Sequence, residues 1–309
     1  MKKRGNVRKY TRRDQIAGHI FISPFILGFL IFTIVPILSS LYYSFTDYSI
    51  LKAPKYIGLD NYIYMLTKDP QFYVSLKATL MYAMVSVPLK LMFALMVAML
   101  LKTTSKLTVL YRALYYLPSL VGSTVAIAVV WRTMFISEGL LNSIINRIFG
   151  TNIDISWIGN PNTAIWTLIL LTVWQYGSSM LIFLSGLKAV PTTLYEAADI
   201  DGASPVQQFF RITLPMLTPV LFFNLIMQLI NGFMSFTQSY VVTQGEPMNL
   251  TMFSAVYIYK TSFSFRRMGY GSAMAWFMLI AVSLITSLLF MSSKYWVFHE
   301  TDMRSKNGK

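Results

Sequence analysis

Five side chains able to bind a hydroxyl-rich solute recur in the otherwise apolar segment 214–240. Their spacing of 4, 3, 4 and 3 residues places them on one stripe of a single helix: Asn224, Gln228, Asn231, Ser235 and Gln238. An amide both donates and accepts hydrogen bonds, which suits the hydroxyls of a sugar. In a membrane such a stripe needs hydrogen-bonding partners. The pattern therefore predicts either a solute path or hydrogen bonds between helices, worth about 1 kcal/mol each.

An aromatic–amide cluster lies near the middle of the apolar segment 164–187, at Trp174, Gln175 and Tyr176. Aromatic rings can stack on the apolar face of a sugar, so this cluster is a second candidate for a solute path. Because 15% of the chain is aromatic, ordinary packing is the alternative for any single ring.

Lys90 places a charge near the middle of the apolar segment 78–101, shortly after Pro88. A charge at that depth is expensive and is normally turned inward or paired. No acidic residue lies in any of the apolar segments. Lys90 is therefore expected to line a water-filled cavity, to extend to the membrane surface, or to meet a carboxylate of a second subunit. Contact with an anionic sugar such as a uronate is a further alternative.

The residues needed for enzymatic or metal chemistry are missing from the sequence. There is no cysteine and no G-x-x-x-x-G-K-(S/T) phosphate loop, and the two histidines, His19 and His299, lie near the ends. No catalytic residue set and no metal site is predicted. The lack of carboxylates in the apolar segments argues against proton coupling, whereas sodium coupling through backbone carbonyls stays open.

Residues 186–215 are the one long polar segment that carries helix-start signals. Capping boxes are predicted at Thr193–Glu196 and Ser204–Gln207, the second with Pro205 at the first helical position. Gly202 between them permits a turn or the close approach of a partner. The segment is expected to form two short helices outside the membrane that serve as a platform for another protein.

The same segment resembles the EAA loop of permease subunits in binding-protein-dependent ABC importers. The match consists of Glu196-Ala197-Ala198, then Gly202, then Ile212-x-Leu214-Pro215. Two other stretches, 56–62 and 268–273, resemble sequences of sugar-importer permeases. The resemblance covers about residues 20–298.

This resemblance implies that the loop is a coupling helix seated in a cleft of an ATPase subunit. The implied partners are a second permease subunit, two ATPase subunits that bind ATP and magnesium, and an extracytoplasmic solute-binding protein. No cofactor is expected in this chain. The substrate class would be carbohydrate, with a pectin (rhamnogalacturonan) oligosaccharide as the particular expectation. The residues implied to couple to the ATPase are Glu196, Ala197, Ala198, Asp199, Asp201, Gly202 and Pro215.

The composition indicates an integral membrane protein. Of 309 residues, 55% are hydrophobic and 12% charged, and soluble proteins carry about twice that charged fraction. Six apolar segments are each long enough to cross a bilayer as a helix. The predicted fold is an all-α membrane protein with six transmembrane helices and a coupling helix between the fourth and fifth. The predicted spans are Phe21–Tyr43, Ala78–Leu101, Ala113–Trp131, Ala164–Leu187, Leu214–Tyr240 and Gly269–Ser293.

The distribution of lysine and arginine predicts the orientation. Six crossings put both termini on one side, and the segments on that side hold more basic residues, with the whole excess in the N-terminal tail. Both termini and residues 186–211 are therefore expected in the cytoplasm of a bacterium. The net charge of +14 is attributed to membrane lipid rather than nucleic acid. The expected divisions are tails at 1–19 and 299–309 and one permease domain at 20–298.

A short helix lying at the membrane surface is predicted at Leu250–Tyr259. Beside the sugar importer, two other functions stay open, namely an ion-coupled secondary transporter and an ABC permease for a non-sugar solute. A membrane scaffold would show no solute flux at all.

Overall fold

The computed structural model describes residues 12–103, 105–122 and 124–298. Most of the predicted N-terminal tail and all of the C-terminal tail at 299–309 lie outside these residues. Within the described part, all regular structure is helical except for two isolated bridges, Thr46–Tyr56 and Ser49–Lys52. The chain divides into two compact units: unit 1 is Met1–Leu66 with Thr261–Trp276, and unit 2 is Thr67–Lys260 with Phe277–Lys309.

The long helix of unit 1 carries the first predicted span. It is continuous through α1 (Arg12–Phe29), the π-helical turn η1 (Leu30–Ile34) and α2 (Val35–Ser44). Pro36 has no N–H, and directly before it the Val35 N–H bonds the Leu30 carbonyl, which widens the turn by one residue. The part from His19 to Ser44 is long and apolar enough to cross a membrane.

The loop after α2 is tied to the end of that helix by the predicted motif at 56–62. Asn61, in the first turn of α3 (Asp60–Thr67), donates from Nδ2 to the carbonyls of Ser44 at 2.9 Å and Thr46 at 3.0 Å. The Tyr62 hydroxyl donates to Ser44 Oγ at 2.9 Å. The remaining helical parts of unit 1 belong to η4 (Lys260–Ser264) and to the start of α14 (Met268–Trp296).

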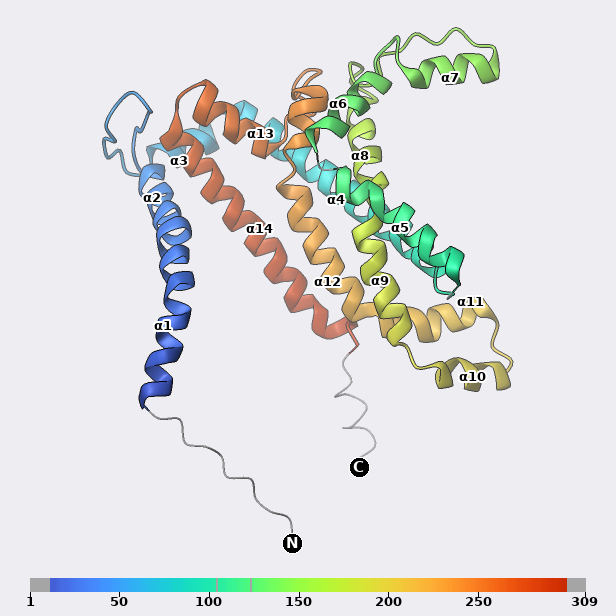
Figure 1. Ribbon diagram of the computed structural model, residues 1–309. Helices are drawn as coiled ribbons and strands as arrows, with labels where there is room; N and C mark the ends of the chain where they lie inside the picture. Colours follow the sequence, from blue (N-terminus) through green and yellow to red (C-terminus); the bar gives the residue numbers. More distant parts are fainter. Residues whose placement is uncertain (1–11, 104, 123, 299–309) are drawn as a thin grey trace. The chain divides into compact units, whose positions relative to one another are not determined.

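Unit 2 is built around α4 (Pro70–Leu100), which packs against four other elements (Figure 1). Asp69 caps its start by accepting a hydrogen bond from the Phe72 amide at 3.2 Å, and Pro70 occupies the first turn. The helices around α4 are α8 (Ala164–Trp174), α9 (Gly177–Ala189), α12 (Leu214–Phe233) and α13 (Ser254–Tyr259).

Two glycines allow the helices of unit 2 to approach closely. A Cβ on Gly232 of α12 would lie 3.3 Å from Ala83 Cβ and Val87 Cγ2 of α4. A Cβ on Gly186 of α9 would lie 2.7 Å from Leu217 Cδ1 of α12. Small residues at such crossings are the usual means by which membrane helices gain packing energy.

Among the residues that the structure describes, four helices are long and apolar enough to cross a membrane, or up to six if each of two bent pairs is one span. The bent pairs are α5 (Lys106–Val121) with α6 (Val125–Met134), at 94°, and α8 with α9, at 44°. The six-span prediction agrees with the upper count. The four candidate spans outside these pairs are His19–Ser44, Pro70–Leu100, Pro205–Thr243 and Met268–Trp296.

The third and fourth predicted spans are therefore not single straight helices. At Ala113–Trp131 the chain turns after Gly122, and Thr124 caps the new helix by accepting from the Ile127 amide at 3.4 Å. At Ala164–Leu187 it bends at Gln175 and Tyr176. Apolar run length reveals a crossing but not an interruption within it.

The prediction of one unbroken helix over Leu214–Tyr240 is wrong as well. Helix α12 ends at Phe233, residues 234–236 are not helical, and the π-helical segment η3 (Gln238–Thr243) follows. The five-residue polar stripe is thus divided between a helix and the break after it. Within the break, a side-chain hydrogen bond connects two members of the stripe, because Ser235 Oγ donates to Gln238 Oε1 at 2.9 Å.

The surface helix predicted at Leu250–Tyr259 is shorter and is packed on α4. In α13, the Ser254 amide donates to Thr79 Oγ1 at 2.8 Å and the Tyr257 hydroxyl donates to Asp69 Oδ2 at 2.7 Å. Val256 between them is fully buried. Polar partners near the start of α4 hold this piece inside unit 2.

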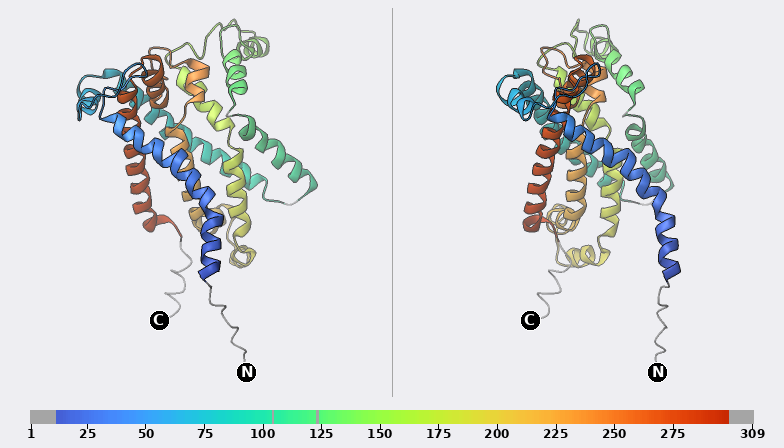
Figure 2. Two further views of the ribbon diagram at one scale, coloured as in Figure 1. Left: turned by 60° about the vertical axis from the view of Figure 1, so that its left-hand side comes forward. Right: turned by 90° about the vertical axis from the view of Figure 1, so that its left-hand side faces the viewer.

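The remaining elements of unit 2 lie at its two ends. Helix α7 (Leu140–Phe149) is at the end where α6 and α8 meet the loop between them. Helices α10 (Thr192–Ile200) and α11 (Pro205–Gln208), followed by the π-helical turn η2 (Phe209–Thr213), lie at the opposite end, as do the last turns of α14 (Figures 1 and 2).

Candidate functional site

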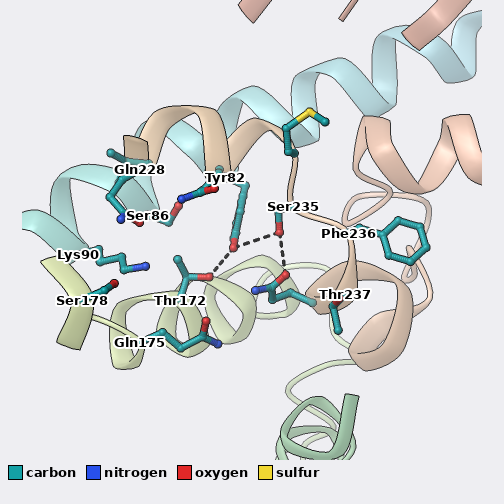
Figure 3. A pocket seen from close by; sticks show the side chains of 15 residues that line it. Tyr82, Ser86, Lys90, Thr172, Gln175, Ser178, Gln228, Ser235, Phe236 and Thr237 are labelled. Atoms are coloured by element: carbon teal, nitrogen blue, oxygen red, sulfur yellow. Dashed lines mark hydrogen bonds between the residues drawn. The ribbon is translucent and has the colours of Figure 1, made fainter. Parts of the chain in front are cut away.

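A polar cavity of about 370 Å³ lies in unit 2, bounded by α4, by the bend between α8 and α9, and by the end of α12 (Figure 3). The structure brings six of the predicted path residues to it: Lys90, Gln175, Gln228, Asn231, Ser235 and Gln238. Amides and hydroxyls dominate the lining, and Tyr82 and Phe236 add two aromatic rings.

Three predicted path residues do not line the cavity. Asn224 is fully buried, and its Nδ2 donates to the Ser179 carbonyl at 3.1 Å, so it joins α12 to α9. The Trp174 ring packs on Trp131 with the ring centroids 5.9 Å apart. Tyr176 packs against Phe93 at 4.8 Å. The polar stripe on α12 therefore has two roles: Asn224 bonds α9, whereas Gln228 and Asn231 line the cavity.

A chain of hydroxyls closes one side of the cavity. The Tyr82 hydroxyl hydrogen-bonds Thr172 Oγ1 and lies 3.5 Å from Ser235 Oγ, which donates to Gln238 (Figure 3). This network connects α4, α8 and the break after α12. It fixes the position of Gln238 relative to the two helices.

Gln175 joins two of the helix interruptions. Its Nε2 donates to the Gly122 carbonyl at 2.8 Å, so the bend between α8 and α9 caps the break after α5. A Cβ at Gly122 would lie 2.4 Å from Gln175 Cγ, which leaves room only for glycine. Gln175 thus bonds the backbone carbonyl of Gly122 and also borders the cavity.

Lys90 is 9% exposed, and its amino group points into the cavity between Gln228 and Ser178 (Figure 3). The structure gives it no ion pair or hydrogen bond to any residue that it describes. A buried ammonium at membrane depth requires water or a ligand. Of the alternatives for Lys90, a place beside a cavity is the one that matches its position in the structure.

Sequence reasoning missed several lining residues. Tyr82 and Ser86 precede Lys90 at intervals of four, so the spacing rule that selected the residues on α12 would also have selected this stripe on α4. The other missed polar side chains belong to Thr172, Ser178 and Thr237.

The polar segment 186–215 forms the predicted pair of short helices. Ser204 and Gln207 form a complete capping box, with the Gln207 amide donating to Ser204 Oγ and the Ser204 amide donating to Gln207 Oε1 at 2.8 Å. Gly202 has a φ of +72° and open space around it, so the turn requires its backbone freedom. The side-chain Nε2 of Gln208 also donates to Asp199 Oδ1 at 2.6 Å, and this bond connects α11 to α10.

The capping box predicted at Thr193–Glu196 is wrong. Pro191 is the extended residue before α10, so Thr193 is already inside the helix and makes no capping bond. Glu196 is consequently free of a capping role and is exposed.

The other residues implied to couple to the ATPase are arranged as one exposed surface with a buried support. Ala197, Asp199 and Asp201 are exposed, whereas Ala198 faces inward at 9% exposure. Ile200 beside them is 88% exposed, which is unusual for so large an apolar side chain at the end of a helix. Pro215 lies in the first turn of α12, partly buried.

The whole segment is anchored to the end of α4 and the start of α12. The Lys102 ammonium lies 4.2 Å from the centre of the Tyr195 ring. The Tyr195 hydroxyl bonds Thr213 Oγ1 at 2.9 Å. Helix α10 is thus connected to the ends of two helices that line the cavity.

Residues 78–297 match the protein family described as "Binding-protein-dependent transport system inner membrane component". The chain belongs to this family and is a permease subunit of an ABC transporter, not itself an enzyme.

Among its relatives is the "Probable ABC transporter permease protein YesP" of Bacillus subtilis, 50% identical over 97% of this chain and 96% of that protein. Another is the "Arabinooligosaccharides transport system permease protein AraP" of the same organism, 34% identical over 88% of this chain and 87% of that one.

A solved structure supports the fold. A chain of a bacterial alginate ABC transporter, crystallised "in complex with alginate pentasaccharide-bound periplasmic protein", superimposes with a TM-score of 0.78. The two chains share 21% identity, and the match covers 91% of this chain and 94% of the other.

The two capping predictions generate a direct test. Removing the Ser204 hydroxyl in Ser204→Ala should lower the local stability of α11 by about 1 kcal/mol, since an N-cap bond is lost. Hydrogen exchange of the amides at 204–208 should then be about fivefold faster. Thr193→Ala is the matched control and should leave exchange in α10 unchanged. Equal effects of the two substitutions would contradict the assignment of the caps.

Proposed function

We propose that this permease imports sugars or oligosaccharides and that the cavity in unit 2 is its part of the solute path. The cavity itself carries the proposal, because its amides and hydroxyls offer both donors and acceptors to a polyhydroxylated solute. The names of relatives point the same way, with AraP named for arabinooligosaccharides and another relative for trehalose and maltose.

The permease is proposed to work with a second, similar permease subunit, two ATPase subunits and an extracytoplasmic solute-binding protein. Helices α10 and α11 would contact one ATPase subunit through Glu196, Ala197, Asp199, Asp201 and Gly202. The exposed Ile200 and the rigid turn at Gly202 support this assignment, because an apolar side chain so exposed fits a protein contact. ATP hydrolysis and magnesium binding belong to those subunits.

The coupling end of unit 2 is proposed to face the cytoplasm of a bacterium, together with both chain termini. The excess of basic residues in the N-terminal tail supports this orientation. The arrangement within unit 2 is consistent with it, since the last turns of α14 lie at the same end as α10 and α11 (Figure 1).

The particular cargo proposed is an acidic pectin fragment of the rhamnogalacturonan type. Lys90 supports this choice, because the ammonium in the cavity has no carboxylate partner among the described residues. A uronate carboxylate would supply that partner, and the buried Lys90 ammonium is a group that is costly to leave unpaired.

The coupling role of the loop is tested by Gly202→Leu and Glu196→Arg. Uptake of oligosaccharide should fall at least about tenfold, equivalent to 1.4 kcal/mol, while the chain remains in the membrane. Gly150→Leu is the control, because Gly150 also has a positive φ and open surroundings but lies beside α7. Normal uptake and normal copurification of an ATPase subunit in the Gly202 and Glu196 variants would refute the coupling role.

The path is tested by comparing Asn231→Leu with Asn224→Leu. Asn231 lines the cavity, so its substitution should raise the KM for uptake severalfold and leave the amount of assembled transporter unchanged. Asn224 bonds α9, so its substitution should reduce assembly or thermal stability instead. Unchanged uptake kinetics in Asn231→Leu would remove this side chain from the path.

The acidic cargo is tested by Lys90→Gln with two labelled oligosaccharides of equal length, one galacturonate-containing and one neutral. Loss of the charge should weaken uptake of the acidic sugar about tenfold and leave the neutral one within about twofold, because only the former pairs with the ammonium. Equal effects on both sugars would assign Lys90 to structure rather than to recognition.

A further inference from the structure

Helix α7 has a strongly amphipathic sequence that the function described so far does not use. At helical spacing its six apolar residues share one side and its four polar residues share the other. The apolar side comprises Leu140, Leu141, Ile144, Ile145, Ile148 and Phe149. The polar side comprises Asn142, Ser143, Asn146 and Arg147.

The polar side of α7 is bound to its own loop. Asn142 is 2% exposed, and its Nδ2 donates to the carbonyls of Ser137 at 2.7 Å and Ile155 at 2.9 Å. Its Oδ1 accepts from Trp157 Nε1 at 2.6 Å.

Asn146 repeats the pattern one turn further on. It donates to the Ile153 carbonyl at 3.0 Å and accepts from the Ile153 amide at 2.7 Å. These bonds fix both the position and the rotation of the helix.

The apolar side is left largely uncovered by this chain. Leu141 packs on the core of unit 2, but Leu140 is 55%, Ile144 45%, Ile148 69% and Phe149 72% exposed. A helix at the surface of a soluble domain has the reverse arrangement, with its apolar side on the protein and its polar side in water. The fixed rotation therefore presents an apolar surface to something outside the chain.

The neighbouring elements indicate what that is. Helix α7 lies between α6 and α8, and each of these is one half of a candidate membrane span. Figure 1 shows α7 beyond the ends of both, with its axis across that of α8. Val130 of α6 and Trp166 of α8 are themselves 52% and 50% exposed, so the apolar surface of the spans continues up to the segment that holds α7.

We propose that α7 lies in the membrane–water interface, with its exposed apolar side in contact with lipid acyl chains. A helix of this kind sits in the plane of the interface with its apolar side about 5–10 Å into the boundary. Charge does not explain the contact, because Arg132 and Arg147 are balanced in this segment by Glu138 and Asp154. The loop 135–163 would thereby be fixed in depth at the end of the spans opposite α10 and α11.

The chain has no cysteine, so single cysteines can be labelled without altering other residues. Ile148→Cys and Ile144→Cys carry a spin label on the apolar side, and Asn152→Cys is the matched control in the exposed part of the same loop. The full chain, with any subunits that copurify, is reconstituted into phospholipid nanodiscs. Collision rates are measured with oxygen, which concentrates in lipid, and with a water-soluble nickel chelate.

Labels at Ile148 and Ile144 should collide severalfold more with oxygen and severalfold less with nickel than the label at Asn152. High nickel accessibility at all three positions would place α7 in water and overturn the proposal. Low accessibility to both reagents at Ile148 and Ile144 would show burial against another subunit, such as a second permease, and would also overturn it. None of these outcomes depends on the identity of the solute.

Discussion

A peptide group inside a membrane has no water to bond, and this constraint determines where the spans of this protein are interrupted. A helix satisfies its own backbone, so a break is tolerated only where protein or a hydrated cavity supplies partners. The breaks after α5, between α8 and α9, and after α12 all border one cavity or contact a residue that lines it. Gln175 caps the first break, and Ser235 with Gln238 occupies the third. The backbone groups that lack a helical hydrogen-bond partner are thus concentrated at the cavity, where a solute could replace water.

Two helices connect that cavity directly to the segment of α10 and α11, the proposed coupling site. Helix α9 begins beside Gln175 and ends just before α10, and α12 begins at the end of η2 and terminates at the cavity. They are packed without intervening space at Gly186, where any side chain would strike Leu217. A displacement of α10 and α11 would therefore be transmitted through the packed helices α9 and α12 to the interruptions that line the cavity.

The sequence predicted the candidate spans and six of the residues that line the cavity because both depend on local patterns. Apolar length reveals a span, and Ser204 with Gln207 forms its cap from neighbouring residues alone. It failed where distant residues decide. Nothing near Ser235 indicates that α12 ends at Phe233. The wrong cap of α10 is a local error instead, because Pro191, two residues before Thr193, is the residue that precedes the helix. The surface helix was predicted at Leu250–Tyr259, whereas that piece packs on α4 through Thr79 and Asp69.

The most direct test of the account is whether a transported solute occupies the cavity. In the cysteine-free chain, Ser178→Cys puts a thiol on the cavity wall and Thr193→Cys puts one at an exposed position of α10, away from the cavity. Both are treated with a water-soluble maleimide in the assembled transporter, with and without saturating oligosaccharide. We expect the thiol at 178 to react, and the sugar to slow that reaction, while the thiol at 193 reacts at the same rate with and without sugar. A thiol at 178 that never reacts, or that reacts at the same rate with and without sugar, would contradict it.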